Sequence, residues 1–147
     1  MPRILVADED EKVRDLIRQM LGGTDCEIED ALDGVDVIRK FLAHPSDLVV
    51  CNLFLPKKDG LEVTLELNNE CKGVQIVVMS GGGNYVQSDL LPVARLLGAS
   101  AVLYKPFQRA ELVNLVHKLL GTDVRLGIRT RSHYRPNRHT TELATAR

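Results

Sequence analysis

The stretch that decides the fold is residues 47–61, with the sequence DLVVCNLFLPKKDGL. It begins with the apolar run at 48–51, passes Asn52, turns between Pro56 and Gly60, and enters a helical stretch marked by Leu61, Leu65 and Leu67. An unbroken apolar run of this length is typical of a strand that is covered on both faces. A strand, a turn and a helix in this order form the repeating unit of a parallel α/β sheet.

The same unit recurs on both sides of this stretch. Three more largely apolar runs of strand length lie at 4–7, 75–79 and 101–104, and residues 26–31 alternate with the period of a strand. Between and after them, apolar residues recur three and four positions apart, as on one face of a helix, in the segments 13–21, 37–42, 90–97 and 112–119. Five strands alternating with five helices predict an α/β fold, a five-stranded parallel sheet with helices on both faces.

Charge divides the chain into two parts. The 147 residues carry a net charge of −1, are 44% hydrophobic and 27% charged, and so have the composition of a globular protein. Residues 122–147 hold six arginines against Asp123 and Glu142, whereas residues 1–121 have an acidic excess. We therefore predict a compact domain at 1–121 and a basic C-terminal extension at 122–147. A solvated extension is favoured over an arm that packs on a neighbouring molecule, and nucleic-acid binding is the least favoured role.

Several classes of protein are disfavoured by simple features. The longest apolar runs have five or six residues, too few to span a membrane. The N-terminal run meets Asp8 too early for a secretory signal. Cys26, Cys51 and Cys71 form no CxxC pair, which argues against a disulfide framework or a zinc site and suits a reducing compartment. We expect a cytoplasmic protein without a membrane span.

Polar residues follow four of the expected strands at the point where each strand ends. They are Asp8 with Glu9, Asn52, Ser80 and Lys105. In a parallel sheet, ligands bind beyond the carboxyl ends of the strands. Two acids and an amide oxygen suit Mg²⁺, while an ammonium and a hydroxyl suit phosphoryl oxygens. Together these groups supply the positioning and charge neutralisation that phosphoryl transfer needs.

Three segments resemble the receiver domain of two-component response regulators: ILVADED at 4–10, residues 47–61, and YKPF at 104–107. The resemblance covers about residues 3–120, in order and at the family's spacing. It implies a flavodoxin-like (βα)5 fold with strand order 2-1-3-4-5. It also implies a Mg²⁺ site formed by Asp8, Glu9, the side chain at position 52 and the backbone carbonyl of Phe54, with Ser80 and Lys105 touching the phosphoryl group.

The resemblance further implies a stand-alone domain in phosphorelay signalling that is not itself an enzyme. Its implied partners are a histidine kinase or a histidine phosphotransfer protein and a downstream protein target, and a homodimer stays open.

The sequence departs from the family at the position that matters most. Receivers carry an aspartate where this chain has Asn52, and that aspartate takes phosphate from the kinase. An amide oxygen is neutral, so we expect Asn52 not to form the acyl phosphate and Mg²⁺ to bind more weakly. Two explanations remain open: a natural pseudo-receiver, or an Asp→Asn change introduced into a competent receiver.

Further features leave alternatives open. Val102 stands where many receivers have an aromatic switch residue, and Tyr104 is the nearby aromatic instead. The glycines at 81–83 are expected to make the loop after the fourth strand free to move. One alternative is a flavodoxin-like module that binds a nucleotide or flavin through this loop, and another is nucleic-acid binding through the basic extension.

Overall fold

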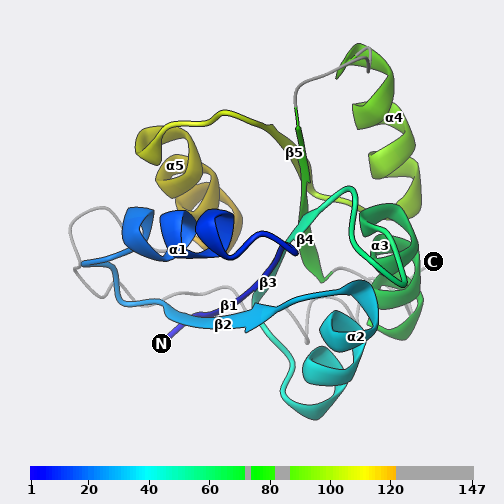
Figure 1. Ribbon diagram of the computed structural model, residues 1–147, viewed down its shortest axis with the longest axis horizontal. Helices are drawn as coiled ribbons and strands as arrows, with labels where there is room; N and C mark the ends of the chain where they lie inside the picture. The colour runs from blue at the N-terminus through cyan, green and yellow to red at the C-terminus, as the bar shows by residue number, and fades with distance from the viewer. Residues whose placement is uncertain (72–73, 82–86, 122–147) are drawn as a thin grey trace.

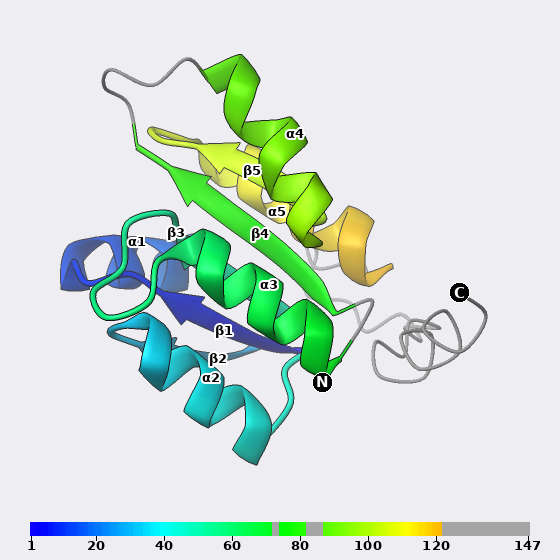
Figure 2. The same ribbon diagram turned by 90° about the vertical axis from the view of Figure 1, so that its right-hand side faces the viewer.

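The computed structural model describes residues 1–71, 74–81 and 87–121. One sheet contains all five strands in the order β2-β1-β3-β4-β5, and every neighbouring pair is parallel. The strands are β1 Arg3–Ala7, β2 Glu27–Ala31, β3 Leu48–Asn52, β4 Gln75–Ser80 and β5 Ala101–Tyr104. The predicted fold class and strand order are therefore confirmed, and Figure 2 shows the strand arrows running in a common direction.

Five helices connect and cover the strands. They are α1 Glu11–Met20, α2 Gly34–Ala43, α3 Gly60–Glu70, α4 Gln87–Leu97 and α5 Arg109–Leu120. Helices α1 and α5 lie on one face of the sheet, and α2, α3 and α4 lie on the other (Figure 1). The core is accordingly in two layers, one on each face of the sheet.

Strand composition follows strand position. All five residues of the central strand β3 are buried, whereas in the edge strand β2 only Ala31 is buried. The unbroken apolar run of β3 therefore packs against both helical layers at once. Burial also raises the pKa of the Cys51 thiol to about 12, which fits a packing role for this side chain.

Aspartate caps fix the start of three helices. The carboxylates of Asp10, Asp33 and Asp59 accept hydrogen bonds from backbone N–H groups in the first turns of α1, α2 and α3. At the other end of the domain, Gly121 ends α5 with a φ of 64°, in the left-handed region that favours glycine.

The buried face of α3 differs from the prediction. Gly60, Val63, Thr64 and Leu67 are the buried residues of this helix, at helical spacing. Leu65 is 45% exposed, so taking it as part of the apolar face was wrong. Leu61 and Leu65 lie on a neighbouring face of the helix, next to the face that is buried. The hydroxyl of Thr64 can be buried because it donates to the Gly60 carbonyl at 2.6 Å.

Within the described residues, every helix is too short or too polar to cross a bilayer. The predicted basic extension at 122–147 lies outside the described residues, so the division of the chain into a domain and an extension stays a prediction. The glycines at 82 and 83 also lie outside the described residues.

Candidate functional site

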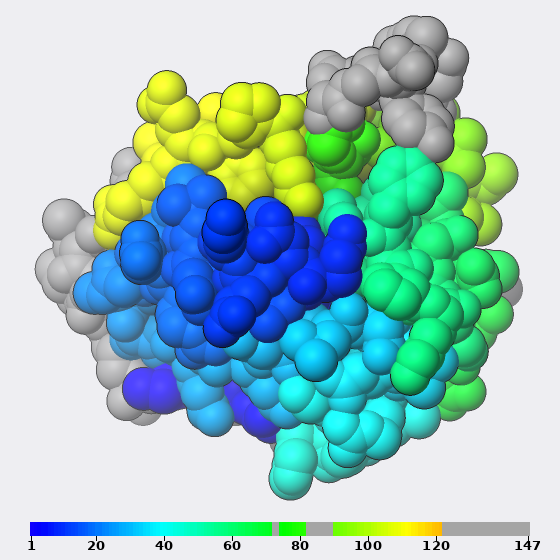
Figure 3. All heavy atoms as spheres, viewed as in Figure 1, coloured from blue at the N-terminus to red at the C-terminus, as the bar shows by residue number. Residues whose placement is uncertain are grey.

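The parallel register brings the sequence-predicted site residues to one edge of the sheet. Asn52 is paired with Met79, which precedes Ser80, and Ser80 is paired with Tyr104, which precedes Lys105. Asp8 follows Ala7, which is paired with Cys51. In Figure 3 the segments after β1 (blue), β3 (teal) and β5 (yellow) meet on the face toward the viewer.

Lys105 joins two of these residues directly. Its Nζ lies 2.8 Å from Asp8 Oδ2 and 3.2 Å from Asn52 Oδ1. Its backbone N–H donates to the carbonyl of Ser80 at 2.8 Å, and the peptide bond to Pro106 is cis. Asp8 is 1% exposed, so the ammonium neutralises a carboxylate that is almost completely removed from water.

The side chain of Asn52 uses both ends of its amide. Its Nδ2 donates to the Phe54 carbonyl at 3.0 Å and to Glu9 Oε2 at 3.3 Å, while its Oδ1 accepts from Lys105. The opposite orientation would place N–H groups against the ammonium and an oxygen against two acceptors. The chemistry of the neighbours therefore fixes the orientation of the amide.

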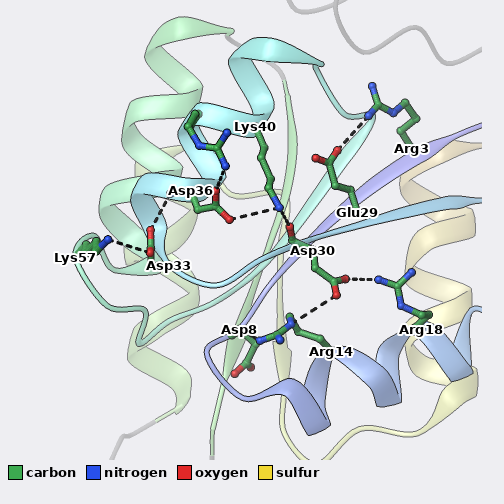
Figure 4. Close-up of polar contacts among 11 residues, drawn as sticks. Arg3, Asp8, Arg14, Arg18, Glu29, Asp30, Asp33, Asp36, Lys40 and Lys57 are labelled. Carbon is green, nitrogen blue, oxygen red and sulfur yellow. Dashed lines mark hydrogen bonds and ion pairs between the residues drawn. The ribbon is translucent and has the colours of Figure 1, made fainter.

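Asp8 is held from three sides. Besides Lys105, its Oδ1 accepts from the backbone N–H of Asp10 at 2.9 Å, and its backbone carbonyl accepts from Arg14 Nη1 at 2.7 Å. Arg14 is 8% exposed and pairs through Nε with Asp30 on β2 at 3.7 Å, and Asp30 also pairs with Arg18 (Figure 4). The backbone of Asp8 is thus held by Arg14 of α1, which in turn pairs with β2, and its carboxylate is held by Lys105 and the Asp10 backbone.

Sequence reasoning missed Arg14. The available signal was its place in the helix, three residues before Ile17 and seven before Leu21, which puts a charged residue on the buried face of α1. A buried arginine needs polar partners, and here Nη1 donates to the backbone carbonyl of Asp8 while Nε lies 3.7 Å from Asp30.

Ser80 reaches the same edge, but its hydroxyl is directed locally. It is buried, and its Oγ donates to the Gly81 carbonyl at 3.4 Å. The structure places Ser80 beside Lys105 through the backbone, and its contact with a phosphoryl group stays a prediction.

The loop after β3 is held by close backbone approaches. A Cβ on Gly60 would lie 2.5 Å from the carbonyl oxygen of Asn52, and a Cβ on Gly34 would lie 2.1 Å from that of Lys58. Gly60 N–H donates to the Leu53 carbonyl at 2.7 Å, and Gly34 N–H donates to the Pro56 carbonyl at 3.1 Å. These contacts keep the Phe54 carbonyl in place beside Asn52.

The donor set can be compared with what Mg²⁺ requires, which is a shell of oxygens. Two of the implied ligands, Glu9 Oε2 and the Phe54 carbonyl, both face the N–H groups of Asn52, and Asp8 Oδ2 faces the Lys105 ammonium. Among residues 1–71, 74–81 and 87–121, no group of three or more His, Cys, Asp or Glu side chains lies together. Mg²⁺ needs only one or two carboxylates, so the contacts of Asn52 and Lys105 decide the question. As arranged, these residues do not fit Mg²⁺.

The sequence and the fold were compared with known proteins. The family described as "Response regulator receiver domain" matches residues 4–117. The chemotaxis protein CheY of Treponema pallidum is 31% identical over 121 residues, which cover 80% of this chain and 82% of that protein. The response regulator MprA of Mycobacterium sp. strain KMS is 34% identical over 119 residues, 80% of this chain. The chain matches only 50% of MprA's length.

Solved structures agree with this assignment. The receiver domain of NtrX from Brucella abortus superposes with a TM-score of 0.74 at 26% identity, covering 81% of this chain and 98% of that one. A receiver domain protein from Clostridium thermocellum gives a TM-score of 0.74 at 21% identity over 82% of this chain and 95% of that one, a likeness of fold alone.

Receiver domains of this family typically bind Mg²⁺ and generally have a histidine kinase as partner. The family match covers most of the chain and includes every residue of the pocket described above. The chain belongs to the response regulator receiver domain family of two-component signal transduction.

Proposed function

We propose that this chain is a receiver that transmits signals through protein contacts and accepts no phosphoryl group at Asn52. The observation that carries the proposal is the amide of Asn52 at the carboxyl end of β3, with its oxygen bound to Lys105 and its nitrogen bound to Glu9 and Phe54.

The chemistry of the acceptor step supports this. In a receiver, a carboxylate oxygen attacks phosphorus while the bond from phosphorus to the histidine nitrogen breaks. The amide oxygen of Asn52 carries no full charge, and the lone pair of its nitrogen is delocalised, so neither atom is a comparable nucleophile. Lys105 and Ser80 remain as groups that would contact phosphoryl oxygens, so the pocket keeps its binding groups and lacks its acceptor.

We also propose that Mg²⁺ binds this pocket more weakly than it binds receivers with an aspartate. A cation between Glu9 and Phe54 would have to break both hydrogen bonds of Asn52 Nδ2. Each loss of about 1.4 kcal/mol lowers the affinity about tenfold.

The proposed setting follows from the family. The proposed partners are a histidine kinase or a histidine phosphotransfer protein and a downstream protein target, in the cytoplasm, with no catalytic activity of the chain itself and with homodimer formation as a further form. Because the chain spans half the length of MprA, these partners are proposals for the receiver and not for a longer protein.

Phosphorylation by a small donor tests the proposal. The native chain, Asn52→Asp and the exposed control Asn114→Asp are incubated with acetyl phosphate and Mg²⁺, and their masses are measured. We expect a phosphoryl adduct only on Asn52→Asp, at position 52. An adduct on Asn52 of the native chain would overturn the proposal, and a folded Asn52→Asp that stays unlabelled would show that the rest of the pocket is not competent.

A further inference from the structure

We infer that Asn52 and Lys105 hold the acidic pocket together in place of a divalent cation, so that the folded domain is indifferent to Mg²⁺. This inference deepens the proposed weak binding of Mg²⁺ and rests on it, and it involves neither phosphate nor a partner. The observation behind it is that the donor groups of these two side chains occupy the acceptors through which a cation would be held.

The pocket contains more acceptors than it could tolerate without donors. Asp8 is 1% exposed, and the chain continues directly into Glu9, while the carbonyl of Phe54 faces them from the loop after β3. Oxygens that converge in this way repel one another unless positive charge or N–H groups lie between them. Asp8 also bears the cost of removal from water, whereas Glu9 is an exposed residue.

Lys105 satisfies the most buried of these groups. Its Nζ contacts Asp8 Oδ2 at 2.8 Å, and the second oxygen of Asp8 accepts from the backbone of Asp10. Both oxygens of this carboxylate therefore have donors from within the chain.

Asn52 satisfies the remaining pair. Its Nδ2 carries two hydrogens, and it has two acceptors at hydrogen-bond distance, Glu9 Oε2 and the Phe54 carbonyl. An ionised aspartate at this position has only acceptor oxygens, so the same place would set oxygen against oxygen. With asparagine in place of aspartate, one side-chain oxygen becomes an NH₂ group. Its two hydrogen bonds then join Glu9 to the Phe54 loop, where a cation would otherwise join them.

The surroundings keep these groups from moving apart. The backbone of Gly60 lies so close to Asn52 that a Cβ at this position would be 2.5 Å from the Asn52 carbonyl oxygen. The N–H of Gly60 also donates a hydrogen bond to the Leu53 carbonyl. On the other side, Arg14 holds the backbone carbonyl of Asp8. Because both sides are fixed, an aspartate at position 52 could not relieve the repulsion by a small shift of the loop.

Thermal unfolding with and without Mg²⁺ tests the inference. The native chain, Asn52→Asp and Asn114→Asp are unfolded in a chelator and then at increasing Mg²⁺. Asn114 is exposed on α5, so its substitution makes the same change of charge away from the pocket. We expect Asn52→Asp to melt below the other two in the chelator. Its Tm should rise by about 5 °C when free Mg²⁺ exceeds the dissociation constant about tenfold, while the native Tm stays constant.

Two outcomes would overturn the inference: a native Tm that rises with Mg²⁺ as that of Asn52→Asp does, or an Asn52→Asp variant as stable in the chelator as Asn114→Asp.

If Asn52→Asp fails to fold under either condition, the side-chain amide signals of Asn52 in a ¹H–¹⁵N spectrum of the native chain decide. Signals that are slow to exchange with solvent and unmoved by millimolar Mg²⁺ support the inference, and signals that exchange freely or shift contradict it. No phosphodonor is present in either experiment, so this inference and the proposed function can fail separately.

Discussion

At position 52 an amide nitrogen stands where a carboxylate oxygen would be an acceptor, and it acts as a donor. The nitrogen donates to Glu9 after β1 and to Phe54 in the loop after β3, while the amide oxygen accepts from Lys105 after β5. Each contact is an ordinary hydrogen bond, worth about 1 kcal/mol net, or somewhat more where one partner is charged. Their combined effect is to join three segments that the chain itself leaves far apart.

Removal of the Lys105 ammonium should be costly, because Asp8 would then be a buried carboxylate without its charged partner. Lys105 is 22% exposed and Asp8 1%, so we expect Lys105→Met to lower the free energy of unfolding by about 2 to 3 kcal/mol. Urea unfolding measures this loss. Lys118→Met, at an exposed position of α5, is the control, with an expected change within about 0.5 kcal/mol. Equal losses in the two variants would show that the contact with Asp8 contributes nothing particular.

Among the elements, α2 shows how charges at the surface support the edge of the sheet. Its cap Asp33 also pairs with Lys57 in the loop after β3, and Asp36 in its first turn pairs with Lys40 (Figure 4). Asp36 also pairs with Arg39. Lys40 in turn donates to the backbone carbonyl of Asp30 on β2. The helix is thus tied both to the loop that carries Phe54 and to the edge strand.

The pairs of Asp36 make a small part of the stability dependent on pH. Burial alone would raise the pKa of this carboxyl, but the hydrogen bond and charge of Arg39, together with Lys40, lower it below 3.8. A lowered pKa in the folded state adds stability that is present above the unfolded-state pKa and is lost as the pH falls through the folded-state value. We expect Asp36→Asn to cost roughly 0.5 kcal/mol at neutral pH and nothing once the carboxyl is protonated. Urea unfolding from neutral pH to about pH 3 checks this, and a cost that stays constant with pH would contradict it.

How much of the structure could be read from the sequence also differs by element. Four strands followed from largely apolar runs, because a run such as that of β3 can be buried on both faces only in the middle of such a sheet. The edge strand β2 followed from its alternating pattern instead. In α3 the spacing of the leucines is compatible with two buried faces of the helix. Packing against the sheet buries the face that contains Val63 and Leu67. The convergence of Asp8, Asn52 and Lys105 on one edge followed from the parallel order of the strands.

The rest of the site depended on contacts that a linear pattern does not contain. The orientation of the Asn52 amide is set by Phe54 and Glu9, which lie on different segments. The part played by Arg14 required knowing that its side chain turns toward the Asp8 carbonyl.

For the whole molecule, most residues of the two apolar layers lie in the strands and helices, and others, such as Leu55 and Phe107, lie in the loops between them. The last buried side chain of α5 is Leu120. Gly121 then ends the helix in a left-handed conformation. Among the described residues, the last helix therefore ends close to residue 117, where the family match ends. The net charge of −1 is the sum of an acidic excess in residues 1–121 and a basic excess in residues 122–147.

Truncation after Gly121 tests whether residues 1–121 are a complete folding unit. We expect the truncated chain to unfold in a single transition with a Tm within about 2 °C of that of the full chain, because it retains both core layers. Calorimetry of the two chains measures this. A marked loss of stability would show that residues 122–147 contribute contacts to the domain, and the boundary at 121 would then be wrong.

The most direct single measurement is a crystal structure of the native chain grown with Mg²⁺ and acetyl phosphate. We expect Asn52 Nδ2 to remain within hydrogen-bond distance of Glu9 and the Phe54 carbonyl, with Lys105 on Asp8 and no ion or phosphoryl group between them. A metal coordinated by Glu9 and the Phe54 carbonyl, or a phosphoryl group bonded to Asn52, would contradict the central claim.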